Sequence, residues 1–202
     1  MIAILDYGIG NITSIYNMLK KIGVKSIVTS DPAVVLSSRK LILPGVGHFD
    51  YCMQQIRKAP FYDAMQEKVL NQKAPVLGVC VGVQMLMEKS AEGKEKGLGW
   101  VPGEVVRFRQ QEIHGLKVPH MSWTDVIPVN NERLYSGIEE PRFYFVHSYH
   151  IMCNQEHITA TADYGYSFTA SVKKDNIMGV QFHPEKSHRF GMNLYSNFAN
   201  HY

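Results

Sequence analysis

One apolar stretch near the middle of the chain, residues 74–87, most constrains the fold. It starts as a run of strand type after a proline, passes through Gly-x-Cys-x-Gly, and continues with helical spacing. This order is typical of a nucleophile elbow, in which a strand enters a sharp turn that carries the nucleophile and leaves as a helix. Gly78 and Gly82 would give the turn the room it needs on either side of Cys80.

Cys80 has two interpretations on this stretch alone. In the first, the thiol lies at the carboxyl end of a strand and over a helix N-terminus, where free N–H groups and the helix dipole favour a thiolate. In the second, it is a small hydrophobic side chain in a buried strand, which is the usual place of a free cysteine. The first interpretation needs a base and an oxyanion site from elsewhere in the chain.

The pattern of the whole chain predicts an α/β fold. Strand-like runs at 2–5, 24–28, 40–43 and 76–80 alternate with helical patterns in the first half, as in an open, mainly parallel sheet flanked by helices. The second half changes to short strand-like runs that favour antiparallel pairing. These runs are 104–108, 117–121, 143–146, 158–162, 168–172 and 177–182. A helix is expected over 186–200, and the 202 residues are expected to form a single domain, 1–202.

Composition excludes several classes of function. A net charge of +3, with no run of Lys or Arg longer than two, argues against nucleic-acid binding. No apolar segment is long enough to span a bilayer, and residues 1–6 read as a first strand rather than a signal peptide. Cys52, Cys80 and Cys153 have no metal-binding spacing, so we expect no metal, no cofactor and a reducing, cytoplasmic setting.

Two glycine-rich turns follow strands in the first half. Gly8-x-Gly10 suggests a dinucleotide site, but Thr13 stands where the third glycine of that fingerprint belongs, so we reject it. The second turn, residues 44–47, reads Pro-Gly-Val-Gly. Its glycines permit backbone angles that turn N–H groups into a crevice as oxyanion donors, although an ordinary turn fits the same residues.

The best candidate for the base is His183, at the end of the apolar run 177–182. Pro184 stops strand pairing there, and the i, i+2 spacing in extended backbone lets His183 and Glu185 approach one locus. A carboxylate beside imidazole holds its tautomer, and an imidazole beside a thiol makes the thiolate. Cys80, His183 and Glu185 therefore form a candidate triad, with a surface corner bearing an ordinary histidine as the alternative.

These motifs together resemble the class I (triad) glutamine amidotransferases. Within that class, nearly the whole chain resembles the family of glutaminase subunits of imidazole glycerol phosphate synthases. The matching motifs lie in order at residues 6–11, 43–47, 78–84, 97–99, 118–121, 145–149 and 181–187. The resemblance implies the fold of the class, with a flavodoxin-like core and added antiparallel strands in the second half.

The resemblance also implies an activity and a partner. The chain would hydrolyse L-glutamine to glutamate and ammonia through a glutamyl thioester on Cys80. The ammonia would pass through a channel to a (β/α)₈ cyclase subunit that makes imidazole glycerol phosphate in histidine biosynthesis. The two subunits would form a heterodimer.

Residue roles follow from the same resemblance. The oxyanion donors would be backbone N–H groups of Val81 and of Val46 or Gly47. Substrate glutamine would contact Gln84 and Glu92, and Ser148 and Tyr149 would bind it through backbone groups. The residues that match positions facing the cyclase are Asn11, Trp123 and Lys186.

Some residues depart from the pattern of that family. Ser122-Trp123-Thr124 replaces the usual Gly-Trp-Asn near the expected interface, which leaves the ammonia acceptor open. One alternative is a paralogous glutaminase subunit that feeds a nucleotide-sugar amidotransferase. Another is a stand-alone γ-glutamyl cysteine hydrolase, which the elbow and the triad by themselves permit.

Overall fold

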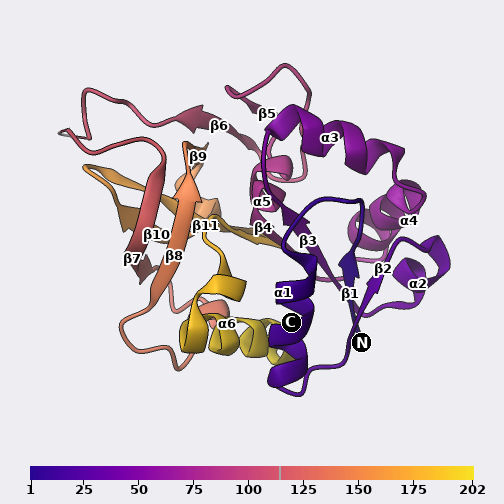
Figure 1. Ribbon diagram of the computed structural model, residues 1–202. Coiled ribbons are helices and arrows are strands. Elements are labelled where there is room, and N and C mark those ends of the chain that lie inside the picture. The colour runs from indigo at the N-terminus through magenta and orange to yellow at the C-terminus, as the bar shows by residue number, and fades with distance from the viewer. Residues whose placement is uncertain (114) are drawn as a thin grey trace.

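The computed structural model describes residues 1–113 and 115–202, and its strands form one continuous, branched sheet (Figure 1). The main path runs β2-β1-β3-β4-β12-β11-β10-β7-β8, and β5, β6 and β9 branch from it through β11. The strands are β1 (Ile2–Leu5), β2 (Ser26–Thr29), β3 (Lys40–Gly45), β4 (Val76–Cys80), β5 (Lys89–Ser90), β6 (Gly103–Arg107), β7 (His120–Pro128), β8 (Arg142–His147), β9 (Tyr149–Cys153), β10 (Ile158–Asp163), β11 (Ser167–Lys174) and β12 (Ile177–Val180).

The first half of the sheet is parallel, which confirms the predicted α/β class. Neighbours β2, β1, β3, β4 and β12 all pair in parallel. Every residue of β1, β4 and β12 is buried, as expected for strands that are covered on both faces. In such a sheet the carboxyl ends of the strands meet at one edge, and this edge carries Cys80 at the end of β4.

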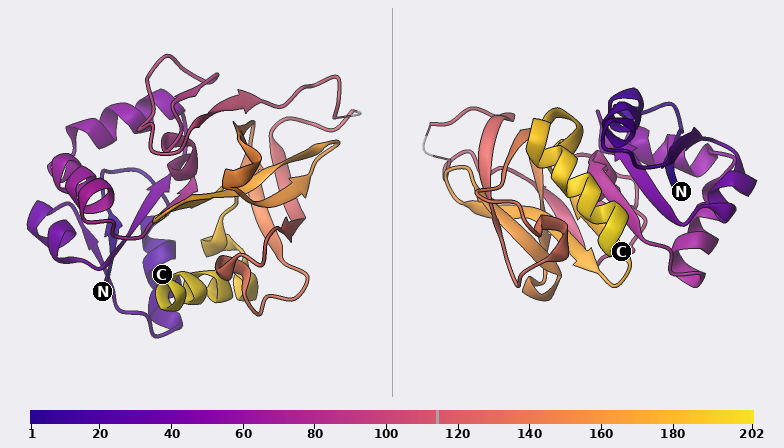
Figure 2. Two further views of the ribbon diagram at one scale, coloured as in Figure 1. Left: turned by 180° about the vertical axis from the view of Figure 1, so that it is seen from behind. Right: turned by 90° about the horizontal axis from the view of Figure 1, so that it is seen from below.

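Helices cover both faces of this parallel half (Figure 2). The helix α6 (His188–His201) packs beside α1 (Ile12–Lys21) on one face, and α5 (Val81–Met85) packs beside α3 (Phe49–Lys58) on the other. The remaining helices are α2 (Pro32–Ser37) and α4 (Tyr62–Gln66), and α4 continues as a π-helical turn at Glu67–Asn71. The N-terminus of α2 is capped by the Asp31 side chain, which accepts a hydrogen bond from Ala33 N at 2.8 Å.

The second half of the chain extends the sheet with antiparallel strands, as predicted. Pairs β12–β11, β11–β10, β10–β7 and β7–β8 are all antiparallel, and β6 pairs with β9 in the same way. Two expectations from the sequence were wrong in extent. Of the run 117–121 only the last two residues are strand, because β7 begins at His120 and continues to Pro128, and β9 was not predicted at all.

The C-terminal helix also starts later than predicted. A 3₁₀ turn at Pro184–Lys186 precedes it, because Pro184 at the first position of a turn leaves no N–H to continue the strand. Leu194, Tyr195 and Phe198 form its fully buried face. No helix among residues 1–113 and 115–202 has both the length and the apolar character of a membrane span.

Candidate active site

Cys80 lies at a sharp junction between β4 and α5, the geometry of a nucleophile elbow. Its φ of 55° and ψ of −115° are strained for a residue with a side chain. The flanking glycines are needed because a Cβ at Gly82 would lie 2.1 Å from Leu43 O, and a Cβ at Gly78 would lie 2.8 Å from the backbone of Gly82. The local sequence therefore folds as an elbow that brings the Cys80 side chain to the edge of the sheet.

His183 and Glu185 lie together at the corner that follows β12. The Nδ1 atom of His183 is 2.7 Å from Glu185 Oε1, and both side chains are almost completely buried. The corner is fixed from two sides: His183 N donates to Tyr144 O at 2.9 Å, and the Ser187 hydroxyl donates to His183 O at 2.6 Å. Because the carboxylate accepts from Nδ1–H, the Nε2 atom remains for chemistry.

The charges around His183 favour its protonated form. Burial alone would lower the pKa of this imidazole, but the charge of Cys80, together with the charge and hydrogen bond of Glu185, outweighs burial and raises the pKa to about 10. Nε2 is buried and makes no hydrogen bond at conventional geometry within the described residues. An imidazolium that lacks a partner on Nε2, beside a thiol, is the arrangement of a cysteine nucleophile and its acid–base partner.

The loop 44–47 borders the same site. The Tyr7 hydroxyl donates to Pro44 O at 2.5 Å, and the Cys52 thiol donates to Val46 O at 3.3 Å. Gly47 has a φ of 89°, a conformation that favours glycine. Among the described residues, no hydrogen bond is made by the backbone N–H groups of Val46 and Gly47, and an oxyanion donor must likewise be unpaired before the substrate binds.

A pocket of about 470 Å³ gathers most of the predicted site residues. Of those predicted, it is lined by Asn11, Val46, Gly47, Cys80, Val81, Gln84, Glu92, Ser148, Tyr149, His183 and Lys186. Glu185 lies behind His183, and only Trp123 is elsewhere. The pocket therefore brings together residues from β4, the 44–47 loop, the start of β9 and the corner after β12.

The hydrogen bonds of Gln84 and Glu92, the candidate substrate residues, leave one side-chain oxygen of each residue available to a ligand. Gln84 Nε2 lies 3.2 Å from Tyr149 O and 3.0 Å from Gln181 Oε1, so its amide oxygen remains available. Glu92 Oε2 accepts from Phe49 N at 2.9 Å, at the start of α3. The other carboxylate oxygen of Glu92 has no protein hydrogen bond within the described part of the chain, which suits a cationic group of a ligand.

Of the three residues predicted to face a partner, Asn11 and Lys186 line the pocket and Trp123 does not. Asn11 also donates from Nδ2 to Glu185 Oε1 at 2.8 Å. Trp123, on β7, stacks on the His188 ring with centroids 5.6 Å apart and planes at 2°. Lys186 is exposed, and its Nζ lies 5.7 Å from the centre of the Tyr144 ring.

Sequence reasoning missed four features of the site. Nothing in the chain signalled the hydrogen bond from Asn11 to Glu185, which joins residues 174 positions apart. Pro119, Val146 and His147 also line the pocket. The motifs 118–121 and 145–149 contained these three residues, but only the pairing of β7 with β8 shows that both motifs reach one site.

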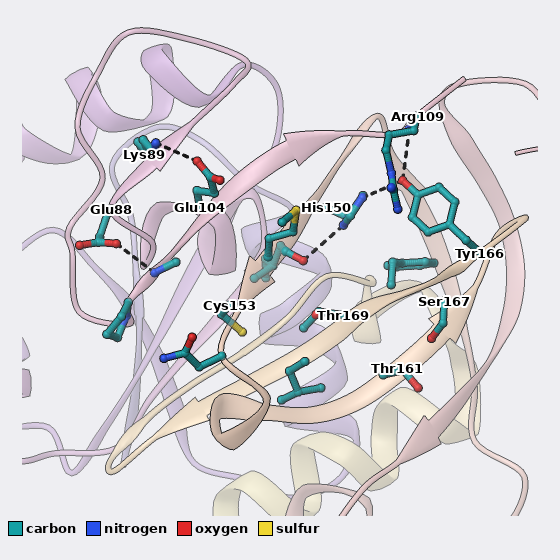
Figure 3. Close-up of a pocket in the computed structure, with 17 residues that line it drawn as sticks. Glu88, Lys89, Glu104, Arg109, His150, Cys153, Thr161, Tyr166, Ser167 and Thr169 are labelled. Carbon is teal, nitrogen blue, oxygen red and sulfur yellow. Dashed lines mark hydrogen bonds and ion pairs between the residues drawn. The ribbon is translucent and has the colours of Figure 1, made fainter. Parts of the chain in front are cut away.

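A second hollow lies away from this pocket, between the strands of the antiparallel half (Figure 3). Its volume is about 790 Å³, and Arg109 and Tyr166 stand at one end of it. His150 Nε2 is 2.9 Å from the Tyr166 hydroxyl, and burial lowers the pKa of His150 to about 4. This hollow contains no residue of the candidate triad. No group of three or more His, Cys, Asp or Glu side chains within 1–113 and 115–202 is placed to hold a metal ion.

Comparison with known proteins agrees with this geometry. The family model described as glutamine amidotransferase class-I matches residues 3–201. The fold of a crystal structure of a glutamine amidotransferase superposes with a TM-score of 0.76 at 16% identity, over 98% of this chain and 96% of the other. PurLQS from Thermotoga maritima superposes with a TM-score of 0.71 at 18% identity, over 99% of this chain and 97% of that chain.

Two curated relatives match over almost the full length of both chains. "Imidazole glycerol phosphate synthase subunit HisH 2" of Pseudomonas aeruginosa is 48% identical over 201 residues, 98% of each chain. The protein of the same name from Methanococcus maripaludis is 47% identical over 200 residues, again 98% of each chain. The chain therefore belongs to the class I glutamine amidotransferases and, within them, to the HisH subunit family. It is a glutamine amidotransferase enzyme.

Proposed function

We propose that this chain is the glutaminase subunit of an imidazole glycerol phosphate synthase and that it supplies ammonia to a cyclase partner in histidine biosynthesis. The proposal rests on the joining of Cys80, His183 and Glu185 at one pocket in a chain 48% identical to a HisH subunit. We also place the chain in the cytoplasm. In support, Cys52, Cys80 and Cys153 are free thiols, as a reducing compartment keeps them.

In the proposed mechanism, the Cys80 thiolate attacks the side-chain amide carbon of glutamine. The resulting oxyanion accepts hydrogen bonds from the N–H of Val81 and from one N–H of Val46 or Gly47, and losing one such donor costs about 3 kcal/mol in the barrier. His183 gives its proton to the leaving nitrogen, which departs as ammonia and leaves a glutamyl thioester. His183 then takes a proton from water, which attacks the thioester, releases glutamate and restores the thiolate. Glu185 orients His183 throughout.

Coupled turnover tests the partner. Glutamate release by the chain alone is compared with release in the presence of the cognate cyclase and its nucleotide substrate. We expect slow release alone and strong stimulation in the complex. A rate that stays flat when the cyclase is added would contradict the proposed partner.

One observation supports a different recipient of the ammonia. Ser122 and Thr124 flank Trp123 where the family commonly has Gly and Asn, on the strand proposed to face the partner. A paralogous subunit that feeds a nucleotide-sugar amidotransferase would bind a different partner through this strand, so its residues at these positions would differ. Growth of a histidine-requiring strain that lacks its own glutaminase subunit separates the two. Restored growth on expression of this chain supports the cyclase, and failed growth despite soluble expression supports the sugar pathway.

A further inference from the structure

Two buried histidines face each other across β7 and β8. His120 and His147 are directly paired in the antiparallel ladder, and their side chains are 0% and 6% exposed. The Nδ1 atom of His120 is 3.1 Å from the Nε2 atom of His147. Phe145 and Tyr164 stack on the two faces of the His120 ring, with centroids 5.0 and 4.0 Å away. The triad mechanism uses neither histidine.

The hydrogen bonds of His147 determine which of its nitrogens carries the proton. Its Nδ1 atom lies 2.8 Å from the backbone oxygen of Tyr149, which can only accept. Nδ1 must therefore carry hydrogen. Burial lowers the pKa of His147 well below its usual value, so the ring is neutral. Its Nε2 is then a bare acceptor, and His120 must donate to it from Nδ1–H.

The same reasoning extends to His120. Burial lowers its pKa to about 4, so this ring is also neutral and its Nε2 is bare. That atom lies 2.9 Å from the Ser122 hydroxyl and 2.8 Å from the Thr124 hydroxyl, both of which can donate. The direction of donation is thus fixed along the whole chain of contacts. One hydroxyl donates to the single lone pair of His120 Nε2, and the other, 3.0 Å from the first, can donate to that first hydroxyl. His120 then donates to His147, and the series ends at the Tyr149 carbonyl.

The end of this chain of hydrogen bonds is in the candidate glutamine pocket. The carbonyl that receives the hydrogen bond of His147 is also the one that lies 3.2 Å from Gln84 Nε2. Since both N–H groups of Gln84 are used, on Tyr149 O and Gln181 Oε1, the Gln84 oxygen is the atom left to accept from a ligand. His147 lines the pocket beside Ser148 and Tyr149.

We infer that His120 and His147 are positioning residues for glutamine. They belong to a hydrogen-bond relay that starts at Ser122 and Thr124 and holds the Tyr149 carbonyl in place. Through this carbonyl the relay sets the orientation of the Gln84 amide. The inference rests on the proposed function for the identity of the ligand. It gives the two unusual hydroxyl residues beside Trp123 a role inside the molecule. They supply the hydrogen bond to the bare Nε2 of His120, and so couple β7 to the substrate pocket.

Variants at position 147 test the relay through substrate affinity. His147→Leu removes the donor to Tyr149 O, whereas His147→Asn keeps a donor where Nδ1 stood. We expect KM for glutamine to rise about fivefold to tenfold in His147→Leu, the effect of one lost neutral hydrogen bond, with kcat within twofold of wild type. His147→Asn should restore most of the affinity.

His150→Leu is the matched control. The rings of Phe108 and Phe168 lie next to both His147 and His150. The Nε2 atom of His150, however, bonds to Tyr166 at the other hollow (Figure 3), outside the relay. This variant should lower thermal stability about as much as His147→Leu and leave KM unchanged. Equal changes of KM in the two leucine variants would overturn the inference, because a general loss of packing would then explain both.

Two further measurements are independent of turnover. Nitrogen-15 NMR of the histidine rings in the full chain should show Nδ1 protonated and Nε2 bare at both His120 and His147 at neutral pH. The opposite tautomer at either ring would overturn the relay. Calorimetric binding of glutamine, in the Cys80→Ala background, should weaken with His147→Leu and recover with His147→Asn, and unchanged binding would overturn the positioning role. A wild-type complex without glutaminase activity would instead overturn the proposed function.

Discussion

At the scale of single residues, Cys80 combines a strained backbone conformation with a position beside the charged ring of His183. A non-glycine residue at φ 55°, ψ −115° costs on the order of 1–3 kcal/mol, and the surrounding packing must sustain that cost. Val79, Cys80 and Val81 are all buried, and Gly82 lies tight against Leu43. The strain holds the thiol at the edge of the sheet, beside the imidazole of His183.

Replacing the proposed nucleophile should abolish turnover. Cys80→Ala removes the only group proposed to form the thioester, so kcat for glutamine hydrolysis should fall by at least about 10⁴-fold. Steady-state release of glutamate in the complex measures it. Cys153→Ala is the control, since this half-buried thiol lies outside the pocket and should leave kcat unchanged. Substantial activity in Cys80→Ala would remove Cys80 from the mechanism.

The dependence of activity on pH should reflect the raised pKa of His183. In the proposed mechanism the protonated ring is the acid that frees ammonia, so kcat should persist through neutral pH and decline as pH rises through about 10, where His183 loses its proton. Glu185→Gln removes one of the charges that raise this pKa. The alkaline decline should therefore move to lower pH in that variant.

The pH profile has a clear contrary result. If Glu185→Gln lowered the rate by the same factor at every pH, the carboxylate would act on geometry alone and not on the charge of His183. Asp163→Asn, a change of carboxylate at the exposed end of β10, is the matched control and should leave the profile as it is.

The residues of the candidate triad could be singled out from sequence because each lies in a local pattern. Gly-x-Cys-x-Gly after an apolar run predicts a sharp turn between strand and helix, and His-Pro-Glu at a strand end predicts a corner. The relay of His120 and His147 could not be predicted, because it depends on the register of β7 against β8. Asn11 reaches Glu185 across most of the chain, and a single sequence carries no signal for such a contact.

At the scale of elements, the junction of β4 with α5 is set by close contact of backbones. A Cβ at Gly82 would lie 2.1 Å from Leu43 O on β3, a distance that real side chains do not adopt. Neither segment can move away easily, since β3 and β4 are paired in register. The glycine is therefore needed for packing of α5 against the sheet.

A substitution at this junction should unfold the protein more easily. Gly82→Ala should destabilise the fold by about 1–3 kcal/mol, as in other overpacked cores, and lower Tm by roughly 3–10 °C in a chain of this size. Thermal unfolding followed by circular dichroism measures it. Gly23→Asn is the control, because Gly23 has a φ of 74° with open space around it, and asparagine tolerates that conformation. An unchanged Tm in Gly82→Ala would show that β3 and α5 separate freely.

The elements differ in how well the sequence predicts them. Strands β1, β3 and β4 are continuous apolar runs bounded by turn residues, so their positions were predicted within a residue or two. Strand β7 was predicted short because its burial pattern mixes exposed and half-buried residues, without the regular alternation of a one-sided strand. Strand β9 follows β8 after one residue, Ser148, so no turn signal separates them, and the sequence predicted only the run 143–146 there.

At the scale of the whole molecule, the two halves of the sheet contribute different parts of the site. The parallel half positions Cys80 at the end of β4 and the loop 44–47, and the antiparallel half brings Tyr149 on β9, whose strand is labelled in Figure 1. The corner after β12, where the two halves meet, holds His183. The site is complete only when both halves are folded against each other.

The proposed partner surface makes a prediction at this scale. Trp123→Ala should weaken binding of the cyclase by about 2 kcal/mol, or roughly thirtyfold in Kd, if the ring is an anchor of the interface. The slow glutaminase activity of the free chain should stay the same. Met152→Ala, which removes an exposed apolar side chain on β9, is the control and should leave Kd unchanged. Equal affinity of wild type and Trp123→Ala would place the interface elsewhere.

Covalent trapping tests the central claim, that Cys80 forms the glutamyl intermediate, most directly. The complex is treated with a diazoketone analogue of glutamine, digested, and its peptides are analysed by mass spectrometry. We predict one adduct, on the peptide that contains Cys80, with none on Cys52 or Cys153 and none on the Cys80→Ala chain. An adduct confined to another residue, or full activity after the analogue has labelled Cys80, would contradict the account.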